Sequence, residues 1–280
     1  MITMFWGASC LLTKLGLDGI EEFNLIALRF IIAFFLSAIV FWKKLKSTDL
    51  KTVKYAAILA GILFATFIFA TFGVSHTTVS NAGFLTCLAG VFIPLITFAL
   101  CKKRPELKVI ASVGIALLGI SLLSFNETLL FNIGDLLCIL CSLAFAAHII
   151  VTGILTNGVD YISLGILQLA FVGIYSTIFS FIFESPKLPN TESSWLIVMA
   201  LSVFCTAAAF IIQTVAQKYT TSTHTGLIFS LEAVFSAIFA FIFVGEILSA
   251  RGYLGAVLLV CSILFIELDF KFIKPRDVNN

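Results

Sequence analysis

Residues 77–85 read TTVSNAGFL, and residues 220–228, which lie 143 positions later, read TTSTHTGLI. The same shift pairs apolar residues that follow each stretch: Leu88 with Leu231, Val91 with Val234, and Phe92 with Phe235. Earlier in each half, a shift of 139 pairs four more positions: Phe5 with Ala144, Trp6 with Phe145, Thr13 with Thr152, and Leu28 with Leu167. We interpret one half of the chain as a diverged copy of the other. Two units are therefore expected, residues 1–126 and 127–270, followed by a tail, residues 271–280.

The composition is that of a protein embedded in lipid. Hydrophobic residues make up 60% of the 280 positions and charged residues only 11%, whereas an average soluble domain has about 25% charged residues. The mean hydropathy is +1.13. The net charge of +2 gives no indication of a nucleic-acid partner. We expect an all-α integral membrane protein surrounded by the lipid bilayer.

Helices that cross the hydrocarbon core need apolar runs of about 20 residues, because any other open backbone would leave polar groups unsatisfied. Ten such runs are predicted, with approximate bounds 2–17, 23–42, 54–73, 78–101, 107–125, 133–153, 162–183, 195–217, 222–244 and 250–268. The first run is short and lacks the basic flank of a signal peptide, so we interpret it as a span. Its shortness leaves open a truncated start.

Basic residues predict the orientation, because loops rich in lysine and arginine stay in the cytoplasm. With the N-terminus inside, thirteen of the seventeen basic residues fall in cytoplasmic segments, most of them within 43–54, 102–108 and 271–276. We therefore expect both termini in the cytoplasm and the chain in a bacterial inner (plasma) membrane. Five spans per unit is an odd number, so the second unit enters the membrane from the opposite side. The sequence predicts two inverted five-helix repeats.

Inverted repeats of this kind are typical of secondary transporters, whose substrate site lies near the midplane where the repeats meet. We expect a cavity formed by the first, third, fourth, sixth, eighth and ninth spans. Rocking of helix pairs would expose a small-molecule substrate in this cavity to each side in turn.

Arg29 and Glu232 lie deep inside predicted spans, where a charge costs about 2.5 to 3.5 kcal/mol and often marks a pathway or a pair. Arg29, whose counterpart is Gln168, either attracts an anionic substrate group or is a structural cation that bonds helix-end carbonyls or extends outward. Glu232, whose counterpart is Ala89, is either a protonatable or substrate-binding acid or a neutral acid bonded to a neighbouring helix.

Polar and aromatic residues share helical faces in both halves. His148 and its counterpart Ser9 each lie one turn from an aromatic residue, which for Ser9 is Trp6. Phe67 in the third span and Gln213 in the eighth belong to similar stripes. Such faces either line a path for a small amphipathic solute or hold helices together by hydrogen bonds.

Asn81 begins the helix of the fourth span and is matched by His224; both are predicted to be helix caps or contacts at the end of a gate. The candidate cavity-lining residues are thus Trp6, Ser9, Phe67, Asn81, His148, Gln213 and Glu232, with Arg29 and Glu232 as the intramembrane charges. No catalytic group, metal site or cofactor motif is predicted.

Five motifs occur in order along the chain: Phe5-Trp6-Gly7-Ala8-Ser9 with Lys14 and Gly16; Leu28-Arg29-Phe30; Asn81 to Leu85 with Pro94; Gly134 to Leu137; and Leu231-Glu232 with Gly245-Glu246. In this order they resemble the EamA-type carriers of the drug/metabolite transporter superfamily, over almost the whole chain. The resemblance implies a ten-helix bundle of two inverted repeats that moves amino acids, other metabolites or drugs, often outward. The sequence departs from the family pattern at Ala233, where proline is common, and at Lys102-Lys103, where Gly-Glu is common.

Export of amino-acid-like or other amphipathic solutes or drugs by alternating access is therefore the favoured function. One alternative is an intramembrane enzyme that acts on lipid-linked substrates, which would need a second catalytic group at the depth of Glu232. Another is a receptor or scaffold, which would be expected to carry a soluble output domain. Substrate identity, direction, coupling ion and the choice between monomer and homodimer remain open at this stage.

Overall fold

The computed structural model describes residues 1–100, 107–124, 132–219 and 222–267, and all regular elements among them are helices. The N-terminal half contains α1 (Ile2–Gly16), α2 (Glu22–Val40), α3 (Trp42–Lys46), α4 (Leu50–His76), α5 (Val79–Thr86), α6 (Ala89–Leu100) and α7 (Leu107–Ser124). The C-terminal half contains α8 (Ile133–Leu155), α9 (Tyr161–Phe183), α10 (Glu192–Ala200), η1 (Leu201–Ala208), α11 (Ala209–Tyr219), α12 (Ser222–Phe239), η2 (Ala240–Val244) and α13 (Ala250–Glu267). The expected tail and the junction between the two units lie outside the described residues.

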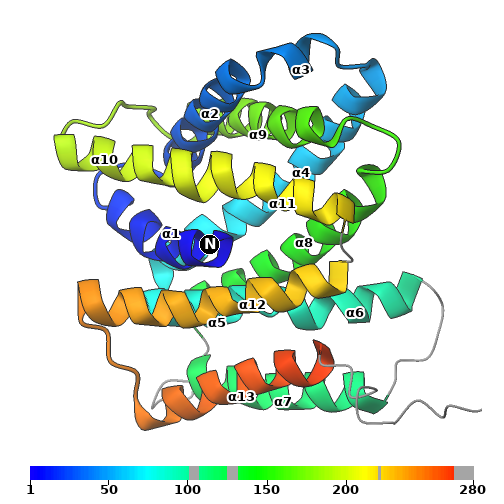
Figure 1. The fold of residues 1–280 in the computed structure, drawn as a ribbon. Helices are drawn as coiled ribbons and strands as arrows, with labels where there is room; N and C mark the ends of the chain where they lie inside the picture. Colours follow the sequence, from blue (N-terminus) through cyan, green and yellow to red (C-terminus); the bar gives the residue numbers. More distant parts are fainter. Residues whose placement is uncertain (101–106, 125–131, 220–221, 268–280) are drawn as a thin grey trace, which may run out of the picture.

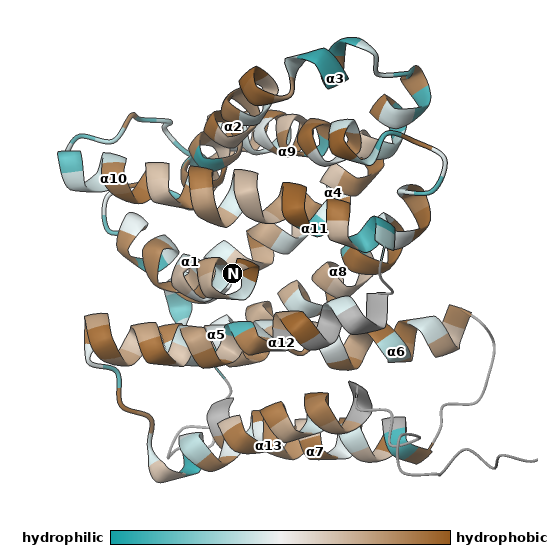
Figure 2. Ribbon diagram, in the orientation of Figure 1, coloured by the Kyte–Doolittle hydropathy of each residue, from teal (hydrophilic) through white to brown (hydrophobic). Residues whose placement is uncertain are grey.

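Helices occupy all ten intervals in which spans were expected. Six helical segments are both long and apolar enough to cross a membrane: Glu22–Val40, Leu50–His76, Val79–Leu100, Ile133–Leu155, Tyr161–Phe183 and Glu192–Tyr219. Shorter apolar helices cover Ile110–Leu122, Leu231–Val244 and Ala250–Phe265. Figure 2 shows hydrophobic residues along the helices, while hydrophilic residues gather at helix ends and in connections.

The segment between the second and third expected spans, residues 43–53, is mostly helical. α3 occupies its first part, and α4 begins at Leu50 instead of residue 54. Asp49 begins α4 early, since its carboxylate accepts hydrogen bonds from the N–H of Thr52 at 3.1 Å and from the hydroxyl of the same residue. A polar first turn of this kind does not register in a search for apolar runs.

Equivalent helices of the two halves lie side by side and antiparallel at the two edges of the bundle (Figure 1). At one edge the N–H groups of Phe23 and Asn24, at the start of α2, donate to the carboxylate of Glu184, just beyond the end of α9. At the other edge Gly119, near the end of α7, lies against Gly255, near the start of α13. Each pair therefore joins the end of one helix to the start of its counterpart.

α12 packs against both α5 and α1 at unusually short range. A Cβ atom on Gly83 of α5 would lie 2.2 Å from Ser236 Oγ, and one on Gly7 of α1 would lie 2.6 Å from Phe235 Cβ. Ser236, near the end of α12, donates to the carbonyl oxygen of Val79 at the start of α5 at 3.1 Å, so these two helices are also antiparallel. Glycine allows helices in lipid to approach this closely.

The central helices meet differently at their two ends. At the end that we call the Thr77 end, the Lys14 ammonium donates to the carbonyl oxygens of Val74 and Thr77, and the Thr77 hydroxyl donates to Asp135. At the opposite end, called here the Lys218 end, Lys218 donates to the carbonyl oxygen of Thr156. The Thr77 end thus joins α1, α4 and α8, and the Lys218 end joins α8 and α11.

Candidate functional site

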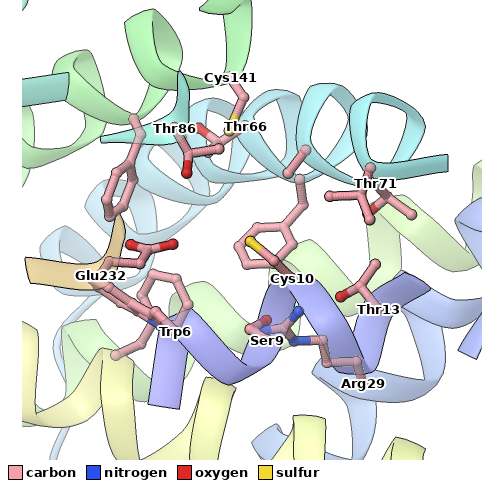
Figure 3. Close-up of a pocket in the computed structure, with 15 residues that line it drawn as sticks. Trp6, Ser9, Cys10, Thr13, Arg29, Thr66, Thr71, Thr86, Cys141 and Glu232 are labelled. Atoms are coloured by element: carbon pink, nitrogen blue, oxygen red, sulfur yellow. The ribbon is translucent and has the colours of Figure 1, made fainter. Parts of the chain in front are cut away.

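A cavity of about 80 Å³ lies between the central helices (Figure 3). Its lining comes from α1, α4, α5, α8, α11 and α12, which correspond to the six spans expected to form it, and Arg29 joins from α2. Five of the candidate residues are brought together here: Trp6, Ser9, Arg29, Phe67 and Glu232. Their roles in binding stay predictions.

Arg29 is bonded inside the bundle. Its side chain is only 4% exposed. Its Nε donates to Thr206 Oγ1, and its Nη2 donates to the carbonyl oxygen of Cys205 at 3.1 Å. The guanidinium carbon lies 4.7 Å from the ring centroid of Phe67. Arg29 therefore does not extend outward, and its Nη1 has no hydrogen bond with a described residue, which leaves donors for a ligand.

The Cys205 carbonyl oxygen, in the π-helical segment η1, accepts hydrogen bonds from side chains of two other helices. In a regular α-helix the N–H of Ala209 would donate to Cys205, but here it donates to the carbonyl oxygen of Thr206. The Cys205 oxygen instead accepts from Trp6 Nε1 at 3.1 Å and from Arg29. One irregular turn of η1 therefore connects α1 and α2 at the edge of the cavity, as π turns at functional sites often do.

Glu232 reaches the cavity from α12, on the side opposite Arg29 (Figure 3). Its carboxylate makes no hydrogen bond or ion pair with any described residue, Arg29 included. The alternative interpretation, a neutral acid bonded to a neighbouring helix, therefore has no bond to support it among these residues. An acid and a guanidinium that face one cavity without pairing with each other leave both groups available to a ligand.

Hydroxyl and thiol groups complete the polar part of the lining. Cys10, Thr66, Thr86 and Cys141 line the cavity but were not candidates from the sequence. The sequence could have indicated Thr66, because Thr66, Ala70 and Val74 recur every four residues on one face of α4. Phe67 and Thr71 lie beside them on that face. Thr86 and Cys141 come from helices whose facing surfaces only the packing reveals.

His148 and Gln213 lie outside this cavity. His148 Nε2 is 3.0 Å from Gln168 Oε1, and Gln168 Nε2 donates to Thr214 Oγ1 at 3.4 Å. Gln213 Nε2 donates to Gln217 Oε1 at 3.0 Å. In this conformation His148 therefore joins α8 to α9, which was its alternative interpretation, whereas Gln213 is bonded to a residue of its own helix, α11.

Asn81 also lies outside the cavity, and its expected role as a cap is wrong. Its backbone N–H donates to Thr78 Oγ1 at 3.1 Å, so Thr78 is the N-cap of α5 and Asn81 belongs to the first turn. The sequence of two threonines before this helix offers an earlier hydroxyl in capping position. The side chain of His224 lies outside the described side chains.

Two loop carboxylates also cap helices near the Thr77 end and at the α2–α9 edge. Glu246 follows Gly245, whose φ of +69° favours glycine, and its oxygens accept from the N–H groups of Val79 and Ser80 at 3.0 Å. Glu184 caps α2 in the same way. Burial raises the pKa of Glu184 above its ordinary value, although the hydrogen bonds from α2 oppose this shift.

A model of the EamA-like transporter family matches residues 1–125 and 132–268. The chain belongs to the EamA-like transporter family. This confirms the resemblance to EamA-type carriers that the sequence motifs indicated. With several apolar helices long enough to cross a bilayer, this EamA-like chain is a multi-pass membrane transporter.

Two curated relatives of the EamA-like chain come from Archaeoglobus fulgidus, and each is described as an uncharacterized transporter. One is 29% identical over 268 residues, which cover 96% of this chain and 84% of the relative. The other is 24% identical over 270 residues, which cover 93% and 92%. A crystal structure of another protein is similar with a TM-score of 0.67 and 18% identity, covering 94% of this chain and 95% of that one. At this identity the likeness shows the fold alone.

Within the described ranges, no group of three or more His, Cys, Asp or Glu residues is arranged to hold a metal ion. Cys138 and Cys141, which form a C-x-x-C sequence, are both buried and free.

Proposed function

We propose that this EamA-like transporter is a secondary transporter that exports small amphipathic, amino-acid-like solutes by alternating access. The observation that carries the proposal is the cavity with Arg29 and Glu232 on opposite sides and not paired with each other. A zwitterion could place its carboxylate near the free guanidinium donors and its ammonium near the acid. Its apolar part would lie against the aromatic rings of Trp6 and Phe67.

The size of the cavity favours a small solute. Pockets for drug-sized ligands usually measure about 300 to 1,000 Å³, whereas this cavity measures about 80 Å³. An amino-acid-like metabolite would require a modest widening, and a drug-sized molecule a much larger one. Small metabolites are therefore preferred over drugs as the substrate class.

The antiparallel pairing of equivalent helices supports inverted repeats as the framework for alternating access. α2 with α9, α7 with α13, and α5 with α12 each pair a helix with its counterpart in the opposite direction. The two ranges matched by the family model, 1–125 and 132–268, agree with two five-helix units. Inverted repeats allow one half of a transporter to close while the other opens.

The basic residues support a plasma-membrane orientation with both termini in the cytoplasm. Lys43, Lys44 and Lys46 lie in or beside α3, at the same end of α9 as Ser163, whose hydroxyl donates to the Lys44 carbonyl oxygen. The Lys218 end would then face the cytoplasm. A cysteine placed at exposed Ser47 should react with an impermeant thiol reagent only after the membrane of whole cells is opened; labelling in intact cells would overturn this orientation.

Transport by purified protein in liposomes tests the function. We expect at least one solute of a panel of labelled amino acids and other small metabolites to be moved. Glu232→Gln should lower its flux about tenfold or more, since loss of one buried charge interaction costs at least about 1.4 kcal/mol. Glu192→Gln, the same change at an exposed position, serves as the matched control.

Two results of this assay would count against the proposal. A folded preparation that moves no member of the panel would overturn transport of this substrate class. Equal flux and an equal pH profile for wild type and Glu232→Gln would assign Glu232 a structural role and remove the main support for a zwitterionic substrate.

A further inference from the structure

Three buried polar atoms at the interface of α8 and α11 have no hydrogen-bond partner among the described residues. They are His148 Nδ1, Thr152 Oγ1 and Gln213 Oε1. The three side chains are at most 1% exposed. Buried polar atoms are nearly always paired, so several such atoms on one interface need an explanation.

The three residues lie on facing surfaces of the two helices. His148 and Thr152 are one turn apart on α8, and Ile149 between them accepts a hydrogen bond from Gln217 Nε2 of α11 at 2.9 Å. Gln217 is in turn bonded to Gln213 at 3.0 Å. The ring of Phe210, one turn before Gln213, is 6.2 Å from the His148 ring. The unpartnered atoms therefore belong to one polar region, which extends from Phe210 toward the Lys218 end.

The repeat relates this region to the open cavity. A shift of 139 residues converts three cavity-lining positions into the three unpartnered ones: Ser9 into His148, Thr13 into Thr152, and Val74 into Gln213. The three positions of the first half therefore line an open cavity, whereas their counterparts in the second half are packed without a cavity.

A layer of aromatic rings separates the two regions. Trp6 lies 5.5 Å from Phe145, 5.4 Å from Phe210 and 4.7 Å from Phe229, between ring centroids. Trp6 and Phe145 are themselves counterparts under the shift of 139. The open cavity lies on the Thr77 side of these rings, and the polar region lies on the Lys218 side.

We propose that the region around His148, Thr152 and Gln213 is a second cavity, collapsed in this conformation, which opens toward the Lys218 end when the first cavity closes. This inference rests on the proposed function. When open, the region presents an imidazole, a hydroxyl and an amide. These groups can hydrogen-bond the polar groups of a solute, but they provide no fixed charge opposite to the charges of the solute. The charged contacts of Arg29 and Glu232 are then replaced by neutral hydrogen bonds on the exit side, which favours release of a zwitterion over retention.

Cysteine accessibility in the reconstituted protein tests this second cavity without a substrate. Thr13→Cys reports on the open cavity, Thr152→Cys on its counterpart, and Ser176→Cys, at a buried serine of α9, is the matched control. A methanethiosulfonate reagent is added from one side, and peptide mass spectrometry locates each modification. We expect Thr13→Cys to react from the Thr77 side and Thr152→Cys to react, at least tenfold faster than Ser176→Cys, from the Lys218 side.

A second measurement uses the wild-type chain, so that a folding defect of a variant does not decide the result. Diethyl pyrocarbonate modifies histidine that reaches water, and exposed His76 provides an internal standard. We expect His148 to be modified more slowly than His76 but to completion. If Thr152→Cys is as unreactive as Ser176→Cys and His148 stays unmodified, the second cavity is overturned.

These outcomes are distinguishable from failure of the proposed function. Transport without labelling of Thr152→Cys overturns the second cavity alone. Labelling of Thr152→Cys from the Lys218 side in protein that moves no solute supports the second cavity and overturns the proposed transport.

Discussion

The two halves of the chain place different chemistry at equivalent positions of one framework. Where the first half has Arg29, the second has Gln168. Arg29 is held from both halves, by the ring of Phe67 and by the hydroxyl of Thr206, and these two residues are themselves counterparts. In the proposed repeat, two similar frameworks carry different side chains, and Arg29 and Glu232 lie in the open cavity. Symmetry of fold therefore does not imply symmetry of function.

The largest loss of transport should come from substitution of Arg29, whose counterpart in the second half is the uncharged Gln168. Arg29→Ala removes the donors to Cys205 and Thr206 and the only cation among the described residues that line the cavity. Two hydrogen bonds from a charged group are together worth about 3 kcal/mol or more, so transport should fall about 100-fold and the unfolding midpoint should drop. Gln168→Ala, its counterpart, loses neutral bonds and should cost tenfold or less. Equal losses in flux assays of the two variants would contradict a functional asymmetry.

The next effect concerns the contact through which the halves pack. Gly83→Ala would place a Cβ atom 2.2 Å from Ser236 Oγ and should destabilise the protein by about 1 to 3 kcal/mol through overpacking. Gly114→Ala, where a Cβ atom meets nothing within 4 Å, should be neutral or slightly stabilising. Thermal unfolding in detergent measures both changes.

A reciprocal change sharpens this second test. Gly83→Ala combined with Ser236→Gly restores the space, so the pair should recover most of the lost stability. Failure to recover would mean that another contact of Gly83 limits the packing of α5 against α12.

A smaller effect is expected from an acid that only one half contains. Glu246→Gln weakens the cap on Val79 and Ser80 and should cost about 1 to 2 kcal/mol of stability. Its counterpart Lys103 lies outside the described residues. Exposed Glu192→Gln controls for the loss of a negative charge, and the same unfolding midpoint in both variants would show that the cap contributes nothing.

The smallest effect should depend on pH. Hydrogen bonds from Thr52 lower the pKa of Asp49 below its ordinary value of about 3.9. A carboxylate whose pKa is lowered by folding stabilises the folded state at every pH above its ordinary pKa. This stabilisation is lost as the pH falls through the lowered pKa. Asp49→Asn should therefore reduce the unfolding midpoint slightly at pH 7, and the difference from wild type should shrink below about pH 4. A difference that is constant down to pH 2 would contradict this account.

Local properties of the sequence were enough to predict much of the fold. Composition and apolar run length predicted helices in a bilayer, because both depend only on residues that are near one another in the chain. The repeat of residues 77–85 at 220–228 predicted which helices are counterparts. The polar first turn of α4 was missed, since a cap at Asp49 interrupts no apolar pattern.

The site depended on contacts between distant residues. Stripes that contain Ser9 and His148 look alike in sequence, and only the packing decided that one lines an open cavity while the other is closed against α11. The partner of Arg29 was equally hidden, because the Cys205 carbonyl lies 176 residues away in the chain and belongs to the irregular segment η1. Sequence alone determined which side chains this transporter has at membrane depth. Tertiary structure decided which of them face each other, since a helical face records spacing but does not record what packs against it.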